Sequence, residues 1–163
     1  MEVVAEAGIG RTTHRAVAAR AGLPLGATTY YFPTLDDLIA AGLQRATDDQ
    51  EEDLRRWAVR LNEAADLPAT LVALVREYLR DQRRAQIEYE LYVAAARNPA
   101  LRPFAAAWLD GLHALLAPRV GPVAAGTISA LLDGAMLQTL VMGTPLDTVT
   151  LTEAIRRLAG PEH

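Results

Sequence analysis

The residues of this sequence that could do acid–base or metal chemistry are few and scattered. There are three histidines, His14, His113 and His163, and no cysteine. The histidines do not form the HExxH spacing that places two zinc ligands on one helix face. Glu88 and Glu90, two positions apart on an expected helix, point to different faces. With no GxSxG turn and no phosphate-binding glycine loop either, the sequence predicts neither an enzyme nor a metal or cofactor site.

A stretch near the amino end, residues 12–33, has the spacing of a helix-turn-helix. Thr12 or Thr13 can cap the first helix, Gly22 supplies the sharp turn, and Leu23 is expected to fill the angle between the helices. The apolar face of that helix is formed by Val17, Ala18 and Ala21. The second helix, from about residue 24 to 31, is rich in small residues that allow a close approach to a DNA groove. The alternative is a small helical hairpin with an Ala-Gly turn and no role in DNA binding.

The elements that position this stretch are all expected to be helices, because helical periodicity covers nearly the whole chain and no segment alternates like a strand. Breaks marked by Gly or Pro are expected at 8–11, 22–24, 32–34, 66–68, 98–103, 118–122 and 143–145. They leave eight or nine helices, the first three short and the rest long. We therefore expect an all-α fold.

The first long helix is expected to join two modules rigidly. Thr34 is a candidate N-cap ahead of Asp36 and Asp37, whose carboxylates suit the positive end of a helix. The helix should run past Arg45 to about residue 61. We predict a DNA-binding domain at 1–46 and a helical domain at 47–163.

Charge and hydropathy narrow the class of protein. The net charge of −4 argues against coating nucleic acid along the whole surface, and within residues 1–46 four arginines are balanced by four carboxylates. No run of about 18 uncharged apolar residues and no signal-peptide layout is present, so we expect no membrane segment and a cytoplasmic location.

Residues 12–33 resemble the N-terminal module of the tetracycline-repressor-like (TetR) family of bacterial regulators. The resemblance lies in Ala21 and Gly22, in Gly26, and in the closing run of residues 30–33, Tyr-Tyr-Phe-Pro. It extends to 3–8, similar to the end of the family's first helix, and to 35–39, similar to its fourth. Since the match begins within that first helix, we expect a truncated N-terminus.

The resemblance implies a three-helix helix-turn-helix module, joined by a long helix to a C-terminal ligand-binding and dimerisation domain. By position, it implies DNA contacts from Thr13, Arg15, Leu25, Gly26, Ala27, Thr29 and Tyr31. Phosphates would be contacted by Thr13, Arg15, Thr29 and Tyr31, and base edges by the early residues of the second helix. Tyr30 and Phe32 are expected in the core.

Two residues depart from the family pattern. Leu25 stands where the family often has lysine or another polar residue, which removes a phosphate contact, and Thr28 stands where a large apolar residue usually packs. Together with the balanced charge, these departures leave open a second class of function. It is a helical dimer that binds a small molecule or a protein and has lost or weakened DNA binding.

The resemblance also implies a pocket in the helices after residue 68, expected near 69–83, 84–96 and 103–116. We predict pocket residues that combine aromatic, polar and apolar character. They are Tyr92, Trp108, His113, Gln138 and Met142. Aromatic side chains at helical spacing are often simply core, so that alternative stays open for each of them.

The last two helices carry the expected dimer interface. Small residues Gly126, Ala130 and Gly134 recur every fourth position on one face of the helix 123–142, which permits another helix to approach closely. Ile155 and Leu158 belong to the last helix, about 151–159, for which Thr150 is a candidate N-cap. The stripe could instead pack within one chain.

The function implied is a homodimeric repressor of a double-stranded, palindromic DNA operator. An unknown small-molecule effector would favour a conformer whose recognition helices no longer match successive major grooves about 34 Å apart. Repression would then be relieved.

Overall fold

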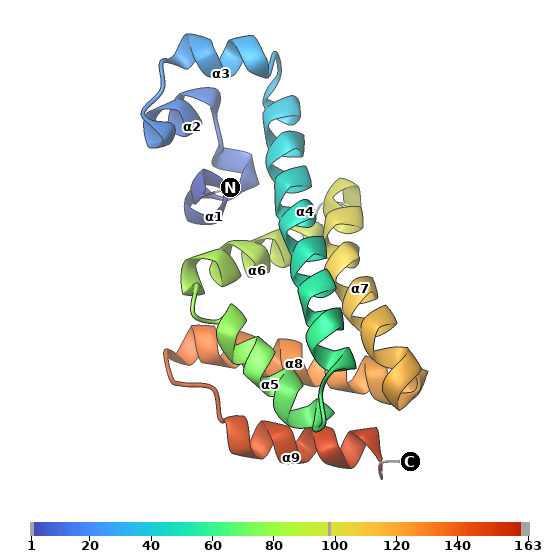
Figure 1. The fold of residues 1–163 in the computed structure, drawn as a ribbon. Coiled ribbons are helices and arrows are strands. Elements are labelled where there is room, and N and C mark those ends of the chain that lie inside the picture. Colours follow the sequence, from blue (N-terminus) through green and yellow to red (C-terminus); the bar gives the residue numbers. More distant parts are fainter. Residues whose placement is uncertain (1, 98, 161–163) are drawn as a thin grey trace. The chain divides into compact units, whose positions relative to one another are not determined.

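The computed structural model describes residues 2–97 and 99–160, and no strand occurs among them (Figure 1). The helices are α1 (Glu2–Ala7), η1 (Ile9–Arg11), α2 (His14–Ala21), α3 (Leu25–Tyr31), α4 (Leu35–Asn62), α5 (Leu67–Tyr78), α6 (Gln82–Arg97), η2 (Pro99–Leu101), α7 (Arg102–Val120), α8 (Pro122–Met142) and α9 (Thr148–Ala159). The prediction of an all-α fold is confirmed.

The chain divides into two compact units. The first unit is formed by residues 1–49 and 86–105, and the second by residues 50–85 and 106–163. Helices α4, α6 and α7 each contribute residues to both. The division places 86–105 with the amino-terminal segment, so the domain boundary at residues 46 and 47 stays a prediction about function rather than a description of packing.

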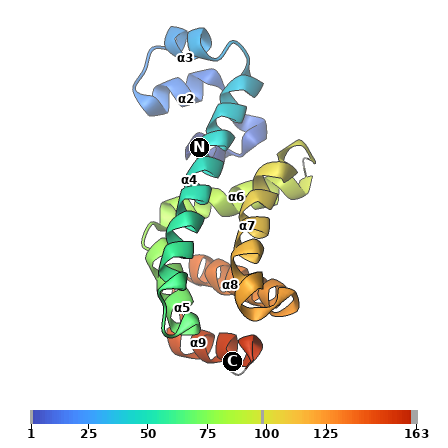
Figure 2. The ribbon, with the colours of Figure 1, turned by 45° about the vertical axis from the view of Figure 1, so that its right-hand side comes forward.

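Helices α2 and α3 form a short hairpin in the first unit, and a glycine sets its turn (Figure 2). α2 begins after Thr13, whose hydroxyl oxygen accepts a hydrogen bond from the backbone N–H of Ala16 at 3.1 Å. It ends at Gly22, where φ is 66°, a left-handed conformation that side chains with a Cβ rarely adopt. The N–H of Leu23 then donates to the carbonyl of Ala18 at 2.9 Å. The expected turn is present, but the side chain of Leu23 is 53% exposed and does not fill the angle between the helices.

Helix α4 begins with a reciprocal cap. The hydroxyl oxygen of Thr34 accepts the backbone N–H of Asp37 at 3.1 Å, and the backbone N–H of Thr34 donates to the Asp37 carboxylate at 3.0 Å. Hydrogen bonds from the Thr34 hydroxyl and N–H hold the pKa of Asp37 below its ordinary value. The predicted cap is confirmed. From Leu35 the helix continues without a break to Asn62, so no loose linker separates its part in the first unit from its part in the second.

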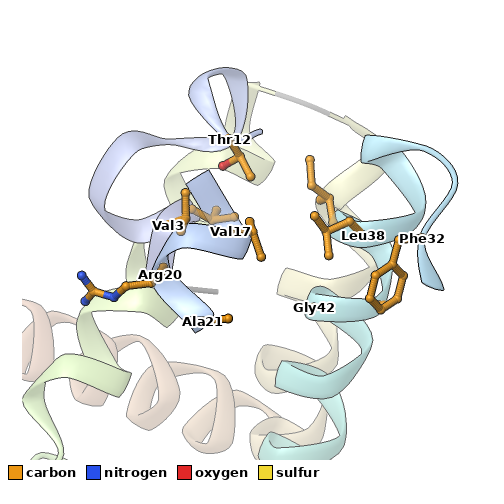
Figure 3. A pocket seen from close by; sticks show the side chains of 11 residues that line it. Val3, Thr12, Val17, Arg20, Ala21, Phe32, Leu38 and Gly42 are labelled. Carbon is orange, nitrogen blue, oxygen red and sulfur yellow. The ribbon is translucent and has the colours of Figure 1, made fainter. Parts of the chain in front are cut away.

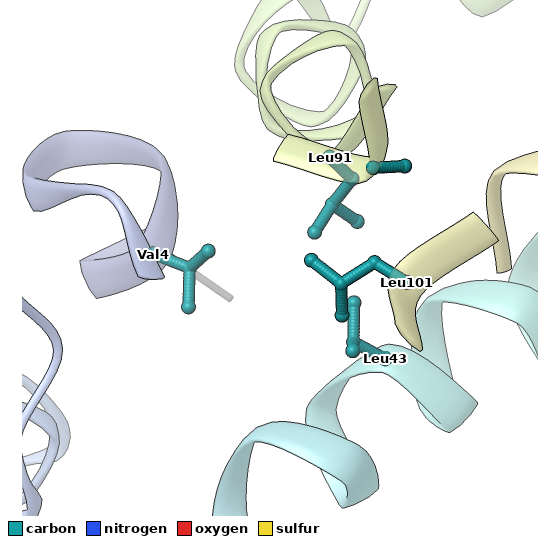
Figure 4. Packing of buried hydrophobic residues seen from close by; sticks show 5 residues of the cluster. Val4, Leu43, Leu91 and Leu101 are labelled. Carbon is teal, nitrogen blue, oxygen red and sulfur yellow. The ribbon is translucent and has the colours of Figure 1, made fainter. Parts of the chain in front are cut away.

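The core of the first unit combines apolar residues from four elements (Figure 4). It contains Val4 of α1, Leu43 of α4, Leu91 and Ala95 of α6, and Leu101 of η2. Leu91 and Ala95 are one helical turn apart and therefore share a face of α6. Each of the five is at most 8% exposed.

The second unit is built around helices α5, α7, α8 and α9. α9 packs against both α5 and α8, as Figure 1 shows. In α8, Ile128, Leu132 and Met136 recur every fourth residue and are buried, which gives that helix one core-facing stripe. Fully buried partners from the other helices include Leu71, Leu74, Val75, Leu112, Leu116 and Ile155.

Three helix boundaries differ from the predictions. α5 ends at Tyr78 instead of near 83, in a turn that holds neither glycine nor proline; the carboxylate of Asp81 accepts the N–H of Arg84 and starts the next helix. The break expected over 118–122 narrows to Gly121, and Pro118 lies inside α7. The N-cap of α9 is Asp147, which accepts the N–H of Thr150 at 3.0 Å, so Thr150 lies in the first turn.

Within residues 2–97 and 99–160, α8 is the one helix long and apolar enough to cross a membrane by length and composition. This is a weak indication, because the core helix of a soluble protein passes the same test. Six of its side chains are buried in the second unit. These are Ala125, Ile128, Ser129, Leu132, Met136 and Thr139.

We expect Gly22→Ala to lower the free energy of unfolding by about 1 to 2 kcal/mol, since the added Cβ is strained at positive φ. A Cβ at either Gly22 or Gly26 would meet no atom within 4 Å, so crowding is not a factor. Gly26→Ala is the matched control; it lies in α3, and alanine there should stabilise by about 0.5 kcal/mol or change nothing. Urea unfolding measures both. A Gly22→Ala variant as stable as the parent would contradict the assigned turn.

Candidate functional site

The surface of the α2–α3 hairpin carries the residues predicted to contact DNA. Six of the seven are exposed, and Ala27 is half-buried. The exposed ones are Thr13, Arg15, Leu25, Gly26, Thr29 and Tyr31, with Leu25 at 42% and Tyr31 at 73%. All seven belong to the first unit, at the start of α2 or within α3. A helical hairpin whose outward face is this accessible can approach a groove.

The two threonines differ in what their hydroxyl groups can offer. Thr13 accepts a hydrogen bond as the cap of α2, which leaves its proton available to a phosphate oxygen. The hydroxyl of Thr29 donates to the carbonyls of Leu25 and Gly26, each at 3.3 Å. To donate to a phosphate, Thr29 must first give up these long contacts within its own helix.

Tyr30 was expected in the core, and this expectation is wrong. Its side chain is 80% exposed and meets Tyr31 edge to face, with ring centroids 5.2 Å apart. The inward face of α3 is set by Thr28, which is buried, and one turn later by Phe32, which is half-buried. Tyr30 lies between these positions and therefore points outward. A count of helical positions from Thr28 would have found this.

Positive charge on the first unit is partly used within the chain. Arg20 pairs with Glu6 at 2.7 Å, and Arg45 pairs with Asp49 at 3.1 Å. Arg15 is exposed, and in the part of the chain that the structure describes it takes part in no ion pair. Arg15 is thus a cation available for phosphate.

A pocket of about 410 Å³ lies within the first unit (Figure 3). Its apolar walls include Val3, Val17, Phe32 and Leu38. Two polar residues line it as well: the hydroxyl of Thr12 donates to the carbonyl of Gly8 at 3.0 Å, and Arg20 is held by its ion pair with Glu6. None of the residues predicted for DNA or effector binding lines this pocket.

In the second unit, three aromatic rings from three helices meet at Trp108 of α7. Trp57 of α4 meets Trp108 edge to face with centroids 5.5 Å apart, and Tyr78 of α5 stacks on it at 5.9 Å. We call these three residues the aromatic cluster. Trp57 is 5% exposed and Trp108 is 3% exposed. Such a group of rings offers flat surfaces for stacking and electron-rich faces for a cation.

Charged groups surround the aromatic cluster. The guanidinium of Arg84 lies over Tyr78, 5.9 Å from the ring centroid, and pairs with the buried carboxylate of Asp53 at 2.5 Å. Asp133 of α8 is half-buried and accepts a hydrogen bond from Trp108. Burial raises the pKa of Asp133 to about 6, although the hydrogen bond from Trp108 acts in the opposite direction. At neutral pH the cluster therefore has a carboxylate held in weakly hydrated surroundings.

The five residues predicted for the effector pocket do not gather in one place. Trp108 is in the aromatic cluster, and His113, half-buried on the same helix, lies near Gly126 of α8. Gln138 and Met142 are exposed on α8, and Met142 is 70% accessible. Tyr92 belongs to the first unit, where it meets Tyr89 edge to face at 5.7 Å.

Sequence reasoning missed Trp57, Tyr78 and Asp133 as neighbours of Trp108. A signal existed for Asp133, because it is the one charged residue in the 21-residue α8. In the described ranges 2–97 and 99–160, no three His, Asp or Glu side chains lie close enough to hold a metal ion.

The predicted interface residues fall into two groups. Gly126, Ala130 and Gly134 are exposed on α8, and Leu158 of α9 is 37% exposed. Ile155 is 0% exposed within the single chain, so its side chain has no surface to offer a partner. Exposed apolar residues continue the α8 stripe at spacings of three and four. They are Val123, Leu137 and Val141.

Comparison with known proteins places these sites in context. Residues 62–161 match the family model described as tetracyclin repressor-like, C-terminal domain. A member of the TetR family, SCO1917 from Streptomyces coelicolor A3, is 44% identical, with a TM-score of 0.84 over 98% of this chain and 92% of that chain.

The multidrug binding protein EbrR is also similar. In its complex with malachite green it is 43% identical, with a TM-score of 0.82 over 98% of this chain and 92% of that chain. In its complex with ethidium it is 43% identical, with a TM-score of 0.79 over 98% and 93%. No curated protein matches this sequence.

The raised pKa of Asp133 predicts a pH-dependent effect on stability. Because the folded pKa of about 6 exceeds the ordinary value of 3.8, the protonated carboxyl favours folding below pH 4, and this contribution is lost as pH rises through 6. Asp133→Asn does not titrate, so its stability relative to the parent should rise between pH 4.5 and 7.5, as measured by urea unfolding. The exposed Asp110 provides the control Asp110→Asn. A stability difference independent of pH would contradict the assignment.

Proposed function

Because this chain belongs to the TetR family of transcriptional regulators, we propose that it is a DNA-binding repressor and not an enzyme. It acts as a homodimer on a palindromic operator and is released by a small-molecule effector. The observation that carries the proposal is the α2–α3 hairpin, with its left-handed turn at Gly22 and its accessible outward face. A regulator that acts on chromosomal DNA works in the cytoplasm.

On DNA, Thr13, Arg15, Thr29 and Tyr31 contact phosphates and fix the orientation of the hairpin. Leu25, Gly26 and Ala27, at the start of α3, face the base edges. Leu25 suits the methyl group of thymine, since apolar contact is how that base is read in the major groove. Tyr30 joins the surface because it is exposed beside Tyr31.

A dimer through α8 and α9 presents two such hairpins about a two-fold axis. Support comes from the accessible stripe of α8, where Gly126, Ala130 and Gly134 permit close helix approach. Leu158 extends the apolar surface on α9. Ile155, buried, stabilises α9 from inside the protomer.

The effector is a multi-ring aromatic compound that stacks in the aromatic cluster. Malachite green and ethidium, the compounds complexed with EbrR, are of this kind. Trp108 and His113 remain from the sequence prediction; Tyr92, Gln138 and Met142 are left out, because the first lies in the other unit and the other two face outward. Effector binding favours a conformer with lower DNA affinity. Equal effector affinity for the free and the operator-bound protein would contradict this coupling.

The second candidate is a helical dimer that binds small molecules without binding DNA. Leu25 in place of a polar residue, and the ion pairs that engage Arg20 and Arg45, favour it. A fluorescence anisotropy titration with DNA from around the protein's own gene separates the two. Binding that weakens steeply with salt supports the repressor, whereas absent binding supports the alternative.

Arg15→Ala should weaken binding to all DNA sequences about equally, because a phosphate contact carries no base information. The slope of log affinity against log salt should fall by about 1. The matched control is Arg80→Ala, an exposed arginine of the second unit. A change in sequence preference in the same anisotropy titration would show that Arg15 reads bases.

Ala130→Arg should convert the dimer to a monomer, because the two-fold axis brings like charges together on the stripe of α8. Size-exclusion chromatography with light scattering gives the mass. Ala114→Arg, also exposed but on α7, is the control and should remain dimeric. A dimeric Ala130→Arg variant would exclude this stripe as the interface.

A further inference from the structure

Helix α8 holds one ionisable residue, and its placement is unusual. Asp133 lies in a 21-residue helix that otherwise has no charge, and it is half-buried within the second unit. A carboxylate in such surroundings loses hydration, so it attracts a positive charge more strongly than a carboxylate at the surface does.

Trp108 connects this carboxylate to the aromatic cluster. The edge of its indole ring donates a hydrogen bond to Asp133, while Tyr78 stacks on it and Trp57 meets it at an angle of 79°. A ligand that replaces either neighbour against the Trp108 ring therefore lies within one indole length of the Asp133 carboxylate. The π faces and the carboxylate attract the same sign of charge.

The cluster already accommodates one cation. The Arg84 guanidinium lies 5.9 Å from the centroid of the Tyr78 ring and pairs with Asp53, which is 7% exposed. This side of the cluster thus shows that a delocalised, flat cation fits beside these rings when a carboxylate is near.

We propose that Asp133 is the counter-ion of the effector, and that the effector is an aromatic cation whose rings stack on Trp108. The inference rests on the effector site proposed above and narrows its ligand class from aromatic compounds to aromatic cations. It also assigns a specificity role to a residue of α8, since a neutral compound of the same shape gains nothing from the carboxylate.

The proposal makes effector binding depend on pH, because the carboxylate of Asp133 is ionised only above about pH 6. His113 of α7 also lies against α8, at Gly126, and histidines ionise in the same range. On α9, which packs on α8, the charged residues pair with one another or with Asp66. They are Glu153, Arg156 and Arg157. Asp110 of α7 is exposed.

The test is a fluorescence titration of the full chain, without DNA, by ethidium, whose quaternary charge does not change with pH. Affinity should be about tenfold lower at pH 5 than at pH 7.5, because a group with a pKa of about 6 is only about one-tenth ionised at pH 5. Neutral phenanthridin-6-one, measured in parallel, should show no such change. Asp133→Asn should bind ethidium about as weakly at pH 7.5 as the parent does at pH 5.

Two variants make the assignment specific. His113→Gln and Asp110→Asn should both keep the pH dependence that Asp133→Asn loses, and circular dichroism reports whether each is folded. Ethidium affinity that is unchanged by pH and by Asp133→Asn would overturn the inference, as would no binding at all. So would a pH dependence lost in His113→Gln. Operator binding, measured separately by anisotropy, shows whether the regulatory function stands when this inference fails.

Discussion

The backbone at Gly22 holds the part of the molecule on which any contact with DNA depends. Its φ of 66° ends α2, and the N–H of the next residue returns to the carbonyl of Ala18, so α3 starts in a new direction after only three residues. Only this change of direction leaves the outward side of α3 uncovered while Thr28 and Phe32 turn inward. The proposed contacts with phosphates and bases all follow from it.

Much of the fold could be predicted because its boundaries are marked by local chemistry. Glycine and proline mark most of the loops, and the Thr34 hydroxyl with the Asp37 carboxylate marks the start of α4. The break after Tyr78 has no such residue, and the turn is completed only by backbone bonds and by Asp81. Asp147 won over Thr150 as the last cap because its carboxylate reaches the third amide of α9.

The sites were less predictable than the fold, since they depend on contacts between distant segments. Trp57, Tyr78 and Trp108 come from three helices, and no periodicity in one sequence pairs them. Tyr30 was a different failure, because the local helical phase contained the answer. Asp133 could have been suspected as a lone charge on an apolar helix, but its bond to Trp108 required the structure.

Trp57 and Trp108 are the two tryptophans of the chain, and both lie in the aromatic cluster, nearly inaccessible to water. The intrinsic ultraviolet emission of this protein therefore comes almost wholly from one location. Edge-to-face contact at 5.5 Å allows the two indoles to exchange excitation energy, so a disturbance at either alters the emission of the pair. The molecule thus carries its own unlabelled optical probe of that location, with no contribution from tryptophan elsewhere in the chain.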